Sequence, residues 1–162
     1  MCARMNGLLV LLASEHKQLH NLATETRDIL DRVIEASGYY GSTAGTRIGG
    51  TCLYACLLLR TALKKFAACS ATIHGGGETS GTGLVCPDGT LCGHYWIQGT
   101  APSGAAFLCD ITADQFGYER IVLLDNTVSW AHYRPDAPAV IATHVADVLQ
   151  DLARLRAPGL PA

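Results

Sequence analysis

The feature that most constrains this chain is a glycine turn that runs directly into an apolar segment. Gly49-Gly50-Thr51-Cys52 opens a run that extends to about Phe66 and is apolar on nearly every side. A helix of this kind must be buried between other layers, so the run predicts a central helix. Cys52 would lie in its first turn, where unpaired N–H groups and the positive end of the helix dipole stabilise a thiolate relative to a thiol. The segment therefore predicts a reactive cysteine.

The composition is that of a globular protein with a substantial core. The chain has 162 residues, of which 49% are hydrophobic and 16% are charged, and this size suits one domain. The net charge is −2, and no basic cluster is denser than Lys64-Lys65. Neither a nucleic acid nor an anionic membrane is therefore expected as a partner. No apolar run approaches the roughly 18 residues that a membrane span needs.

The cysteines indicate a reducing compartment. There are seven of them, so at least one cannot pair within the chain, and several lie in apolar runs where a free thiol acts as a small hydrophobe. We therefore expect a cytoplasmic protein. The apolar stretch from Leu8 to Ala13, preceded by Arg4, resembles a weak signal peptide, but its shortness favours the start of a first helix.

Helical patterns come first and strand patterns follow, which predicts the α+β class in a single domain, residues 1–162. The expected helical part covers residues 8–66, with a first helix from Leu8 to Ala36 that Ser37-Gly38 closes. The expected sheet covers residues 67–125 and includes an antiparallel meander of strands at 91–98, 105–112 and 121–124. An amphipathic helix at 140–156 closes the chain.

A histidine and an aspartate on neighbouring strands of that meander could complete a catalytic group. His94 lies in the first strand and Asp110 in the second, and pairing through a turn at 100–104 makes them cross-strand neighbours. If the central helix packs on this sheet, it presents Cys52 to His94. Cys52 is then the nucleophile, His94 the acid and base, and Asp110 the group that holds the imidazole tautomer. The Cys52 backbone N–H would serve as an oxyanion donor.

This order of residues resembles the transglutaminase-like branch of the papain-like cysteine enzymes. The segment Arg47 to Cys52 is similar to the Arg-Gly-Gly-x-Cys turn of arylamine N-acetyltransferases, which share the triad, although one isoleucine is inserted here. Gly93-His94-Tyr95-Trp96 and the segment from Cys109 to Gly117 resemble the His and Asp strands of small bacterial and phage transglutaminase-like proteins. The resemblance extends from Arg47 to about Leu124.

The resemblance implies a papain-like fold in which the central helix carrying Cys52 packs on an antiparallel sheet. It implies a cysteine-dependent enzyme that attacks an amide bond of a protein or peptide through an acyl-thioester, without a cofactor or metal. Hydrolysis by a protease, amidase or glutamine deamidase is the favoured outcome, and the alternative is a transglutaminase or acyltransferase that passes the acyl group to an amine. Family analogy also suggests delivery as a bacterial or phage effector.

Four further residues are candidates for contact with the substrate or oxyanion: Gly50, Thr51, Gln115 and Trp96. Papain-type enzymes place a glutamine before the nucleophile, but none lies between Asn21 and Cys52. Tyr39, Tyr40, Thr51 or a backbone amide would have to supply that function. For Trp96, the alternative is an aromatic residue of the core or its rim.

Other uses of these residues stay open at this point. Asp114 or Asp125 could replace Asp110 as the orienting carboxylate. Cys86, Cys92 and His94 could bind zinc, with His74 or Cys109 as a fourth ligand, although the C-x2-4-C spacing that closed zinc sites favour is absent. A Cys86–Cys92 disulfide is another option. The corresponding rival function is a non-catalytic binding module or zinc-knuckle adaptor.

Overall fold

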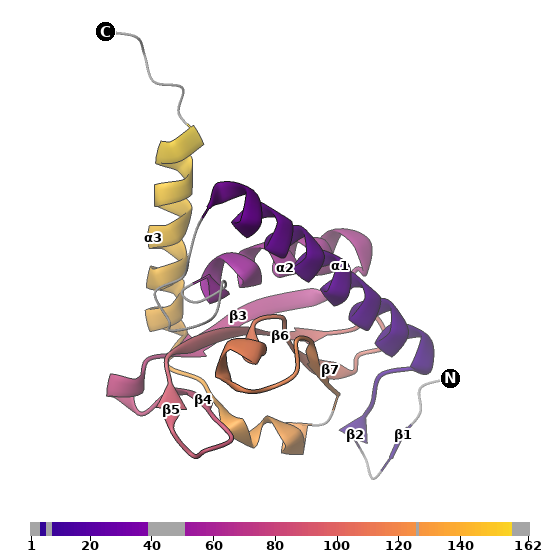
Figure 1. Ribbon diagram of the computed structural model, residues 1–162. Coiled ribbons are helices and arrows are strands. Elements are labelled where there is room, and N and C mark those ends of the chain that lie inside the picture. The colour runs from indigo at the N-terminus through magenta and orange to yellow at the C-terminus, as the bar shows by residue number, and fades with distance from the viewer. Residues whose placement is uncertain (1–3, 6–7, 39–50, 126, 157–162) are drawn as a thin grey trace, which may run out of the picture.

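The computed structural model describes residues 4–5, 8–38, 51–125 and 127–156 (Figure 1). Within these ranges the chain has three α-helices and antiparallel sheets, so the predicted α+β class is confirmed. The helices are α1 (Ala13–Ser37), α2 (Cys52–Phe66) and α3 (Pro138–Arg156). The strands are β1 (Arg4–Met5), β2 (Leu8–Leu9), β3 (Ser70–Gly76), β4 (Gly83–Val85), β5 (Leu91–Cys92), β6 (His94–Thr100), β7 (Ala106–Asp110), β8 (Val122–Leu124) and β9 (Tyr133–Arg134). Short 3-10 helices are η1 (Glu78–Ser80), η2 (Ala113–Phe116) and η3 (Thr127–His132).

The first helix begins later than the sequence predicts. Leu8–Leu9 form β2, which pairs with β1, and α1 starts only at Ala13. The Glu15 carboxylate accepts a hydrogen bond from the Leu12 N–H at 3.0 Å and so caps the first turn. A short apolar run does not by itself distinguish helix from strand, which is why the predicted start at Leu8 is wrong. The predicted end of the helix is confirmed, because Gly38 adopts the left-handed conformation at φ = 65° and its N–H donates a hydrogen bond to the Glu35 carbonyl.

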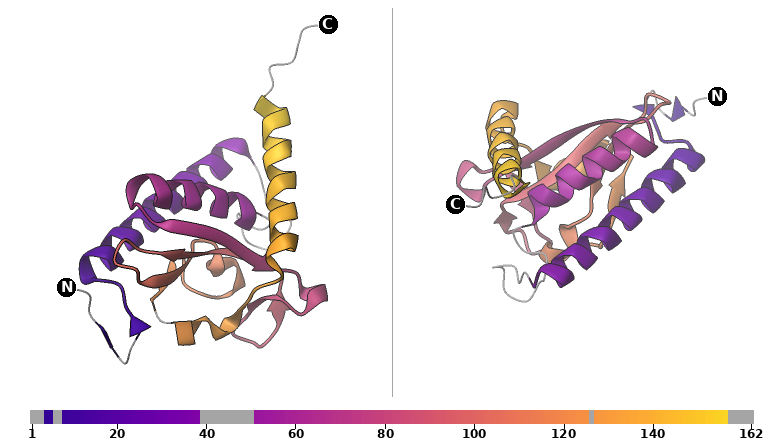
Figure 2. Two further views of the ribbon diagram at one scale, coloured as in Figure 1. Left: turned by 180° about the vertical axis from the view of Figure 1, so that it is seen from behind. Right: turned by 90° about the horizontal axis from the view of Figure 1, so that it is seen from above.

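The central helix α2 begins at Cys52, as the sequence predicts, and lies between α1 and the sheet (Figure 2). Its inward side carries the buried residues Leu53, Ala55, Cys56, Leu59 and Leu63. Burial on every side was expected, but Tyr54 and Leu58 are exposed. One stripe of the helix therefore faces outward, because α1 covers only part of its outer surface.

The main sheet has the strand order β3-β6-β7-β8, and all neighbours are antiparallel. The predicted meander is confirmed as β6, β7 and β8, with β3 added at the edge beside β6. A tight turn joins β6 to β7, in which the Ala101 N–H bonds the Ala105 carbonyl at 2.9 Å and the Gly104 N–H bonds the Ala101 carbonyl at 2.8 Å. His94 and Asp110 lie at the strand ends away from this turn.

A glycine divides the strand that was predicted from Leu91 to Gln98. β5 ends at Cys92, Gly93 lies between, and β6 begins at His94. β5 belongs to a second small sheet of order β5-β4-β9, whereas β6 belongs to the main sheet. The chain thus passes from one sheet to the other at a single residue, and His94 lies at the junction.

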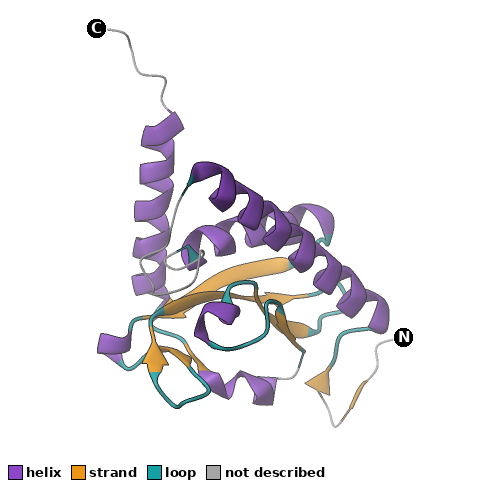
Figure 3. Ribbon diagram, in the orientation of Figure 1, coloured by secondary structure: helices purple, strands orange, loops and turns teal. Residues whose placement is uncertain are grey.

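Two hydrophobic clusters cover the two faces of the main sheet. The larger lies toward α1 and α2 and includes Leu19, Leu59, Leu63, Ile97 and Phe107. The smaller lies on the opposite face and consists of Leu84, Trp96, Leu108, Ala113 and Tyr133. Figure 3 shows the two helices above the sheet and the second small sheet with η3 below it.

The closing helix α3 begins at Pro138, two residues before the predicted start, and its first turns pack beside β3. Among the helices of the described ranges, none has the length and apolar character that crossing a membrane requires.

Candidate active site

Cys52, His94 and Asp110 each lie at the end of an element of secondary structure. Cys52 is the first residue of α2, His94 is the first residue of β6 and Asp110 is the last residue of β7. Their relative exposures are 9%, 0% and 1%, so Cys52 is the most exposed of the three. The N-terminus of the helix and the two strand ends meet here, which places a thiol, an imidazole and a carboxylate in one buried region.

His94 and Asp110 form a buried hydrogen-bonded pair. Nε2 of His94 lies 2.7 Å from Oδ2 of Asp110, which confirms the predicted cross-strand contact. The register places Ile97 opposite Cys109, so one further step places Asp110 opposite Trp96 and diagonal to His94. Diagonal neighbours remain within reach of long side chains. The contact is therefore diagonal, whereas directly opposed positions were expected.

The carboxylate of Asp110 has two further partners. The Thr112 N–H donates to Oδ1 at 2.9 Å, and the Tyr133 hydroxyl donates to Oδ2 at 3.1 Å. Burial raises the pKa of Tyr133, and the adjacent Asp110 charge raises it further, so the phenol keeps its proton and acts as a donor. These contacts fix the orientation of the carboxylate. Sequence analysis did not identify Tyr133, because no local pattern marks a contact across 23 residues.

The imidazole of His94 is held in its charged form. Burial disfavours the charge, but the Asp110 carboxylate and its hydrogen bond outweigh burial and, with the nearby Cys52 thiol, raise the pKa of His94 to about 10. The other ring nitrogen, Nδ1, is buried and makes no hydrogen bond of normal geometry with the described residues. With Nε2 engaged by Asp110, Nδ1 is the nitrogen available to exchange a proton with the thiol. The Phe116 ring packs edge-on against the imidazole, with centroids 4.9 Å apart.

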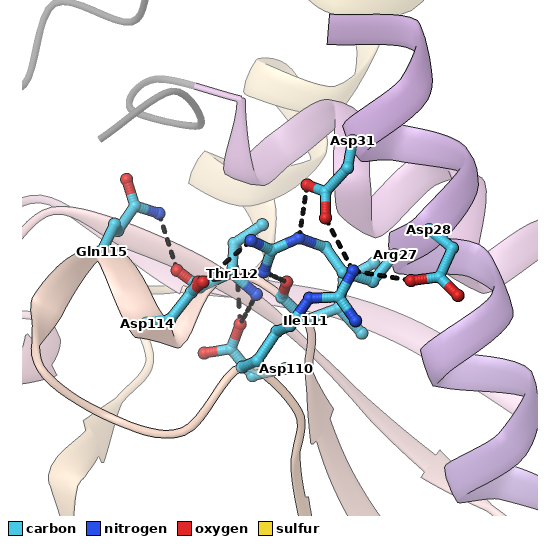
Figure 4. Close-up of polar contacts among 9 residues, drawn as sticks. Arg27, Asp28, Asp31, Asp110, Ile111, Thr112, Asp114 and Gln115 are labelled. Atoms are coloured by element: carbon cyan, nitrogen blue, oxygen red, sulfur yellow. Dashed lines mark hydrogen bonds and ion pairs between the residues drawn. The ribbon is translucent and has the colours of Figure 1, made fainter. Parts of the chain in front are cut away.

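A buried arginine on α1 holds the loop that follows Asp110 (Figure 4). Arg27 is only 5% exposed, and its guanidinium makes two hydrogen bonds to the Asp114 carboxylate, at 2.9 and 2.8 Å. The same guanidinium donates to the Ile111 carbonyl, and its Nε donates to Asp31 at 2.8 Å. Burial opposes the charge of Arg27, but Asp114 and Asp31 outweigh it and raise the pKa of the guanidinium. Arg27 thus fixes residues on both sides of Thr112, whose N–H in turn holds Asp110.

Two aspartates were alternatives to Asp110 as the orienting carboxylate, and the structure favours neither. Asp114 pairs with Arg27. For Asp125, no hydrogen bond to His94 is found among the described residues, and Nε2 of His94 is engaged by Asp110.

The four expected substrate or oxyanion residues are placed differently from one another. Gly50 lies outside the described residues, as do Tyr39 and Tyr40. Thr51 directly precedes α2 and is buried beside Cys52. Gln115 directs its side-chain amide to the Thr112 carbonyl at 2.9 Å.

Trp96 does not lie at a surface. It is 0% exposed and packs in the smaller cluster against Tyr133, with ring centroids 5.0 Å apart. The expectation that Trp96 contacts substrate is therefore corrected to a core role. The reason is that strand β6 is covered on both faces. Side chains that point to either face are therefore buried, and their alternation along the strand does not show which of them borders a cleft.

The alternative zinc site is not assembled by the described residues. Among them, no group of three or more His, Cys, Asp or Glu side chains could hold a metal ion. His94 is bound to Asp110, and Cys109 is buried on β7. Cys86 and Cys92 do lie together, with their sulfur atoms 2.9 Å apart and both thiols free.

Two hollows on the surface lie away from the Cys52 region. One is lined by residues from Arg60 to Ala71, near the C-terminal end of α2. The other, of about 340 Å³, lies between α3 and β3 and includes His74 and Ile141. Neither lining includes Cys52, His94 or Asp110.

Comparisons of the chain with protein-family models, with curated proteins and with solved structures find no match. The interpretation of the site therefore depends on its own residues and their geometry.

Proposed function

We propose that this protein is a cysteine-dependent acyl-transfer enzyme that attacks an amide bond with Cys52. The observation that carries the proposal is the buried His94–Asp110 pair, 2.7 Å between Nε2 and Oδ2, together with the interaction of the same imidazole with the Cys52 thiol at a helix N-terminus. A buried titratable pair with a strongly shifted pKa is typical of a functional site. The order of helix, His strand and Asp strand supports a transglutaminase-like, papain-like assignment.

The first half of the reaction forms a thioester. In the resting site, Nδ1 of the charged His94 imidazole holds the proton that the Cys52 thiol has given up, and the resulting thiolate attacks the amide carbonyl carbon. The first helical hydrogen bond of α2 runs from the Ala55 N–H to the Thr51 carbonyl, so the preceding N–H groups of Cys52, Leu53 and Tyr54 have no acceptor within the helix. The Cys52 N–H can therefore stabilise the oxyanion. Collapse of this intermediate breaks the C–N bond, and His94 gives its proton to the leaving amine.

The second half releases the acyl group. His94 takes a proton from an incoming water, the water oxygen attacks the thioester carbonyl, and Cys52 leaves as a thiolate. We propose water as the acceptor, which makes the enzyme a protease, amidase or glutamine deamidase that acts on a protein or peptide. Throughout both halves Asp110, held by Thr112 and Tyr133, keeps Nε2 engaged and Nδ1 directed to the reacting atoms.

Acylation by a small activated ester tests the nucleophile without knowledge of the natural substrate. The full chain is incubated with p-nitrophenyl acetate, and intact mass and peptide mapping locate the acetyl group. We expect one acetyl group on Cys52, released by hydroxylamine as a thioester is. Cys52→Ala should abolish the adduct. Cys56→Ala is the matched control, because Cys56 is a buried thiol one turn further along α2, and it should leave acylation unchanged.

The fate of the acetyl group distinguishes hydrolysis from transfer. In water alone we expect free acetate and a regenerated thiol. If added primary amine captures most of the acetyl group as an amide at millimolar concentration, the acceptor is an amine and the hydrolase assignment is wrong. If acetylation spreads evenly over all seven cysteines, or persists in Cys52→Ala, the enzyme proposal itself is wrong and a binding role is favoured.

A further inference from the structure

The hairpin of β4 and β5 brings two thiols together. Its register pairs Leu84 with Cys92 and Val85 with Leu91, and the Cys86 N–H bonds the Thr90 carbonyl at 2.7 Å. Cys86, directly after β4, and Cys92, on β5, are thus diagonal neighbours across the hairpin. The backbone geometry of the turn therefore determines their separation.

The sulfur atoms are close enough for a bond. They lie 2.9 Å apart, and both are free thiols. A disulfide requires an S–S distance of about 2.05 Å, so each sulfur must move by only about half an ångström. Cys92 is half-exposed, whereas Cys86 is buried. A small oxidant can therefore reach Cys92 first.

The hairpin also contacts both sides of the candidate active site. Gly93 alone separates Cys92 from His94 at the start of β6. The Tyr118 hydroxyl, which follows η2 in the loop beyond Asp110, donates a hydrogen bond to the Val85 carbonyl. A disulfide in the hairpin would therefore constrain the backbone from Val85, which binds the loop after Asp110, to His94 at the start of β6.

We propose that Cys86 and Cys92 form a redox-active pair that a small-molecule disulfide converts reversibly into an intramolecular disulfide. This inference is independent of the proposed function, since it involves neither Cys52 nor acyl transfer. Burial, together with the Cys92 thiol, raises the pKa of Cys86 to about 11, which favours Cys92 as the attacking thiol and Cys86 as the resolving one.

The exchange proceeds in two balanced steps. The Cys92 thiolate attacks one sulfur of the small disulfide, which breaks that S–S bond, forms a mixed disulfide and releases one small thiolate. Cys86 then loses its proton and attacks the Cys92 sulfur, which forms the protein disulfide and releases the second thiolate. The two protein thiols are oxidised, the small disulfide is reduced to two thiols, and the two protons of the protein thiols end on those products.

Oxidised glutathione is the probe that tests this pair in the full-length chain. After incubation, free thiols are blocked with iodoacetamide under denaturing conditions, and the intact mass is measured. We expect loss of the mass of two hydrogen atoms, two fewer blocked thiols, and full recovery after dithiothreitol. Cleavage before Asp88 separates Cys86 from Cys92, so the two fragments should stay linked until they are reduced.

Variants identify the resolving thiol. Cys86→Ser should stop at the mixed disulfide and retain one glutathione on Cys92, whereas Cys69→Ser, which changes another buried thiol, should oxidise as the natural chain does. The proposal is wrong if the natural chain retains glutathione on Cys92 without forming the linked peptide, if the linkage joins other cysteines, or if both thiols stay fully available for alkylation. Peptide mapping of the natural chain decides this even if a variant fails to fold.

Discussion

The Arg27 guanidinium and the Asp114 carboxylate form a two-pronged ion pair, at 2.9 and 2.8 Å, which ties helix α1 to the loop after Asp110. Paired hydrogen bonds of this kind specify orientation as well as distance. Arg27 is buried, so the loss of Asp114 would leave part of the guanidinium charge without a partner and with poor access to water. The position of the loop, and through it of Asp110, therefore depends on a helix that contributes no reacting atom.

Arg27→Met should destabilise the fold and slow the reaction of Cys52. We expect the free energy of unfolding to fall by about 2–3 kcal/mol, less than for a fully buried pair because the Asp114 side chain is 29% exposed. Urea unfolding measures this, and site-resolved iodoacetamide labelling measures Cys52. Arg120→Met is the matched control, because Arg120 binds Asp28 and Asp31 at the surface and should cost about 1 kcal/mol or less. Equal losses in the two variants would contradict a special role for Arg27.

The His94–Asp110 pair should make stability depend on pH. The ordinary pKa of histidine is 6.5; in the fold, burial opposes the imidazolium, but the Asp110 charge raises the pKa of His94 to about 10. A raised pKa means that this stabilisation is complete below about pH 6.5 and is lost as pH rises through about 10. Urea unfolding across that window should show a falling free energy of unfolding in the natural chain. The fall should be largely absent in Asp110→Asn, and parallel curves would refute the assignment.

Tyr133→Phe should loosen Asp110 while keeping the core filled. Loss of the 3.1 Å hydrogen bond should lower the free energy of unfolding by about 1 kcal/mol. It should also slow acetylation of Cys52, since the orientation of the imidazole depends on Asp110. Tyr118→Phe makes the same chemical change where the hydroxyl bonds the Val85 carbonyl, and acetylation should continue at the natural rate there. If the two variants slow acetylation equally, Tyr133 has no particular link to the site.

Gly75→Ala should disrupt the strand beside His94. A Cβ at Gly75 would lie 2.7 Å from the His94 carbonyl oxygen and 2.4 Å from the Tyr95 ring, and the backbone oxygen of a paired strand cannot move aside. We expect a loss of about 1–3 kcal/mol in urea unfolding. Gly77→Ala is the control, because its nearest neighbour would be Thr79 at 3.8 Å. A Gly75→Ala protein as stable as Gly77→Ala would show that the strands can separate at no cost.

The sequence was informative where local patterns determine the structure. Cys52 marks the start of α2 because a glycine turn meets an apolar run, and His94 and Asp110 meet because a short turn sets the register of two adjacent strands. Both are short-range features of the chain. They are sufficient to predict the contact between His94 and Asp110, although not its diagonal geometry.

The remaining features depend on packing between distant segments. Arg27 and Asp114 are separated by 87 residues, and an arginine within an amphipathic helix does not itself reveal a buried partner. For Trp96, the sequence did not distinguish a substrate contact from a core role, because both faces of β6 are covered. The strand from Leu91 was predicted as continuous because Gly93 alone does not show that the chain changes sheets.

The position of Asp110 and Asp114 late in the fold has a consequence for biosynthesis. During synthesis the ribosome adds Cys52 long before it adds either aspartate. The ion pair between Arg27 and Asp114 joins residues that are 87 positions apart. A nascent or truncated chain that ends before residue 110 lacks the carboxylate that binds Nε2 of His94. The Cys52 thiol thus lies beside a completed His94–Asp110 pair only when most of the sheet has been made.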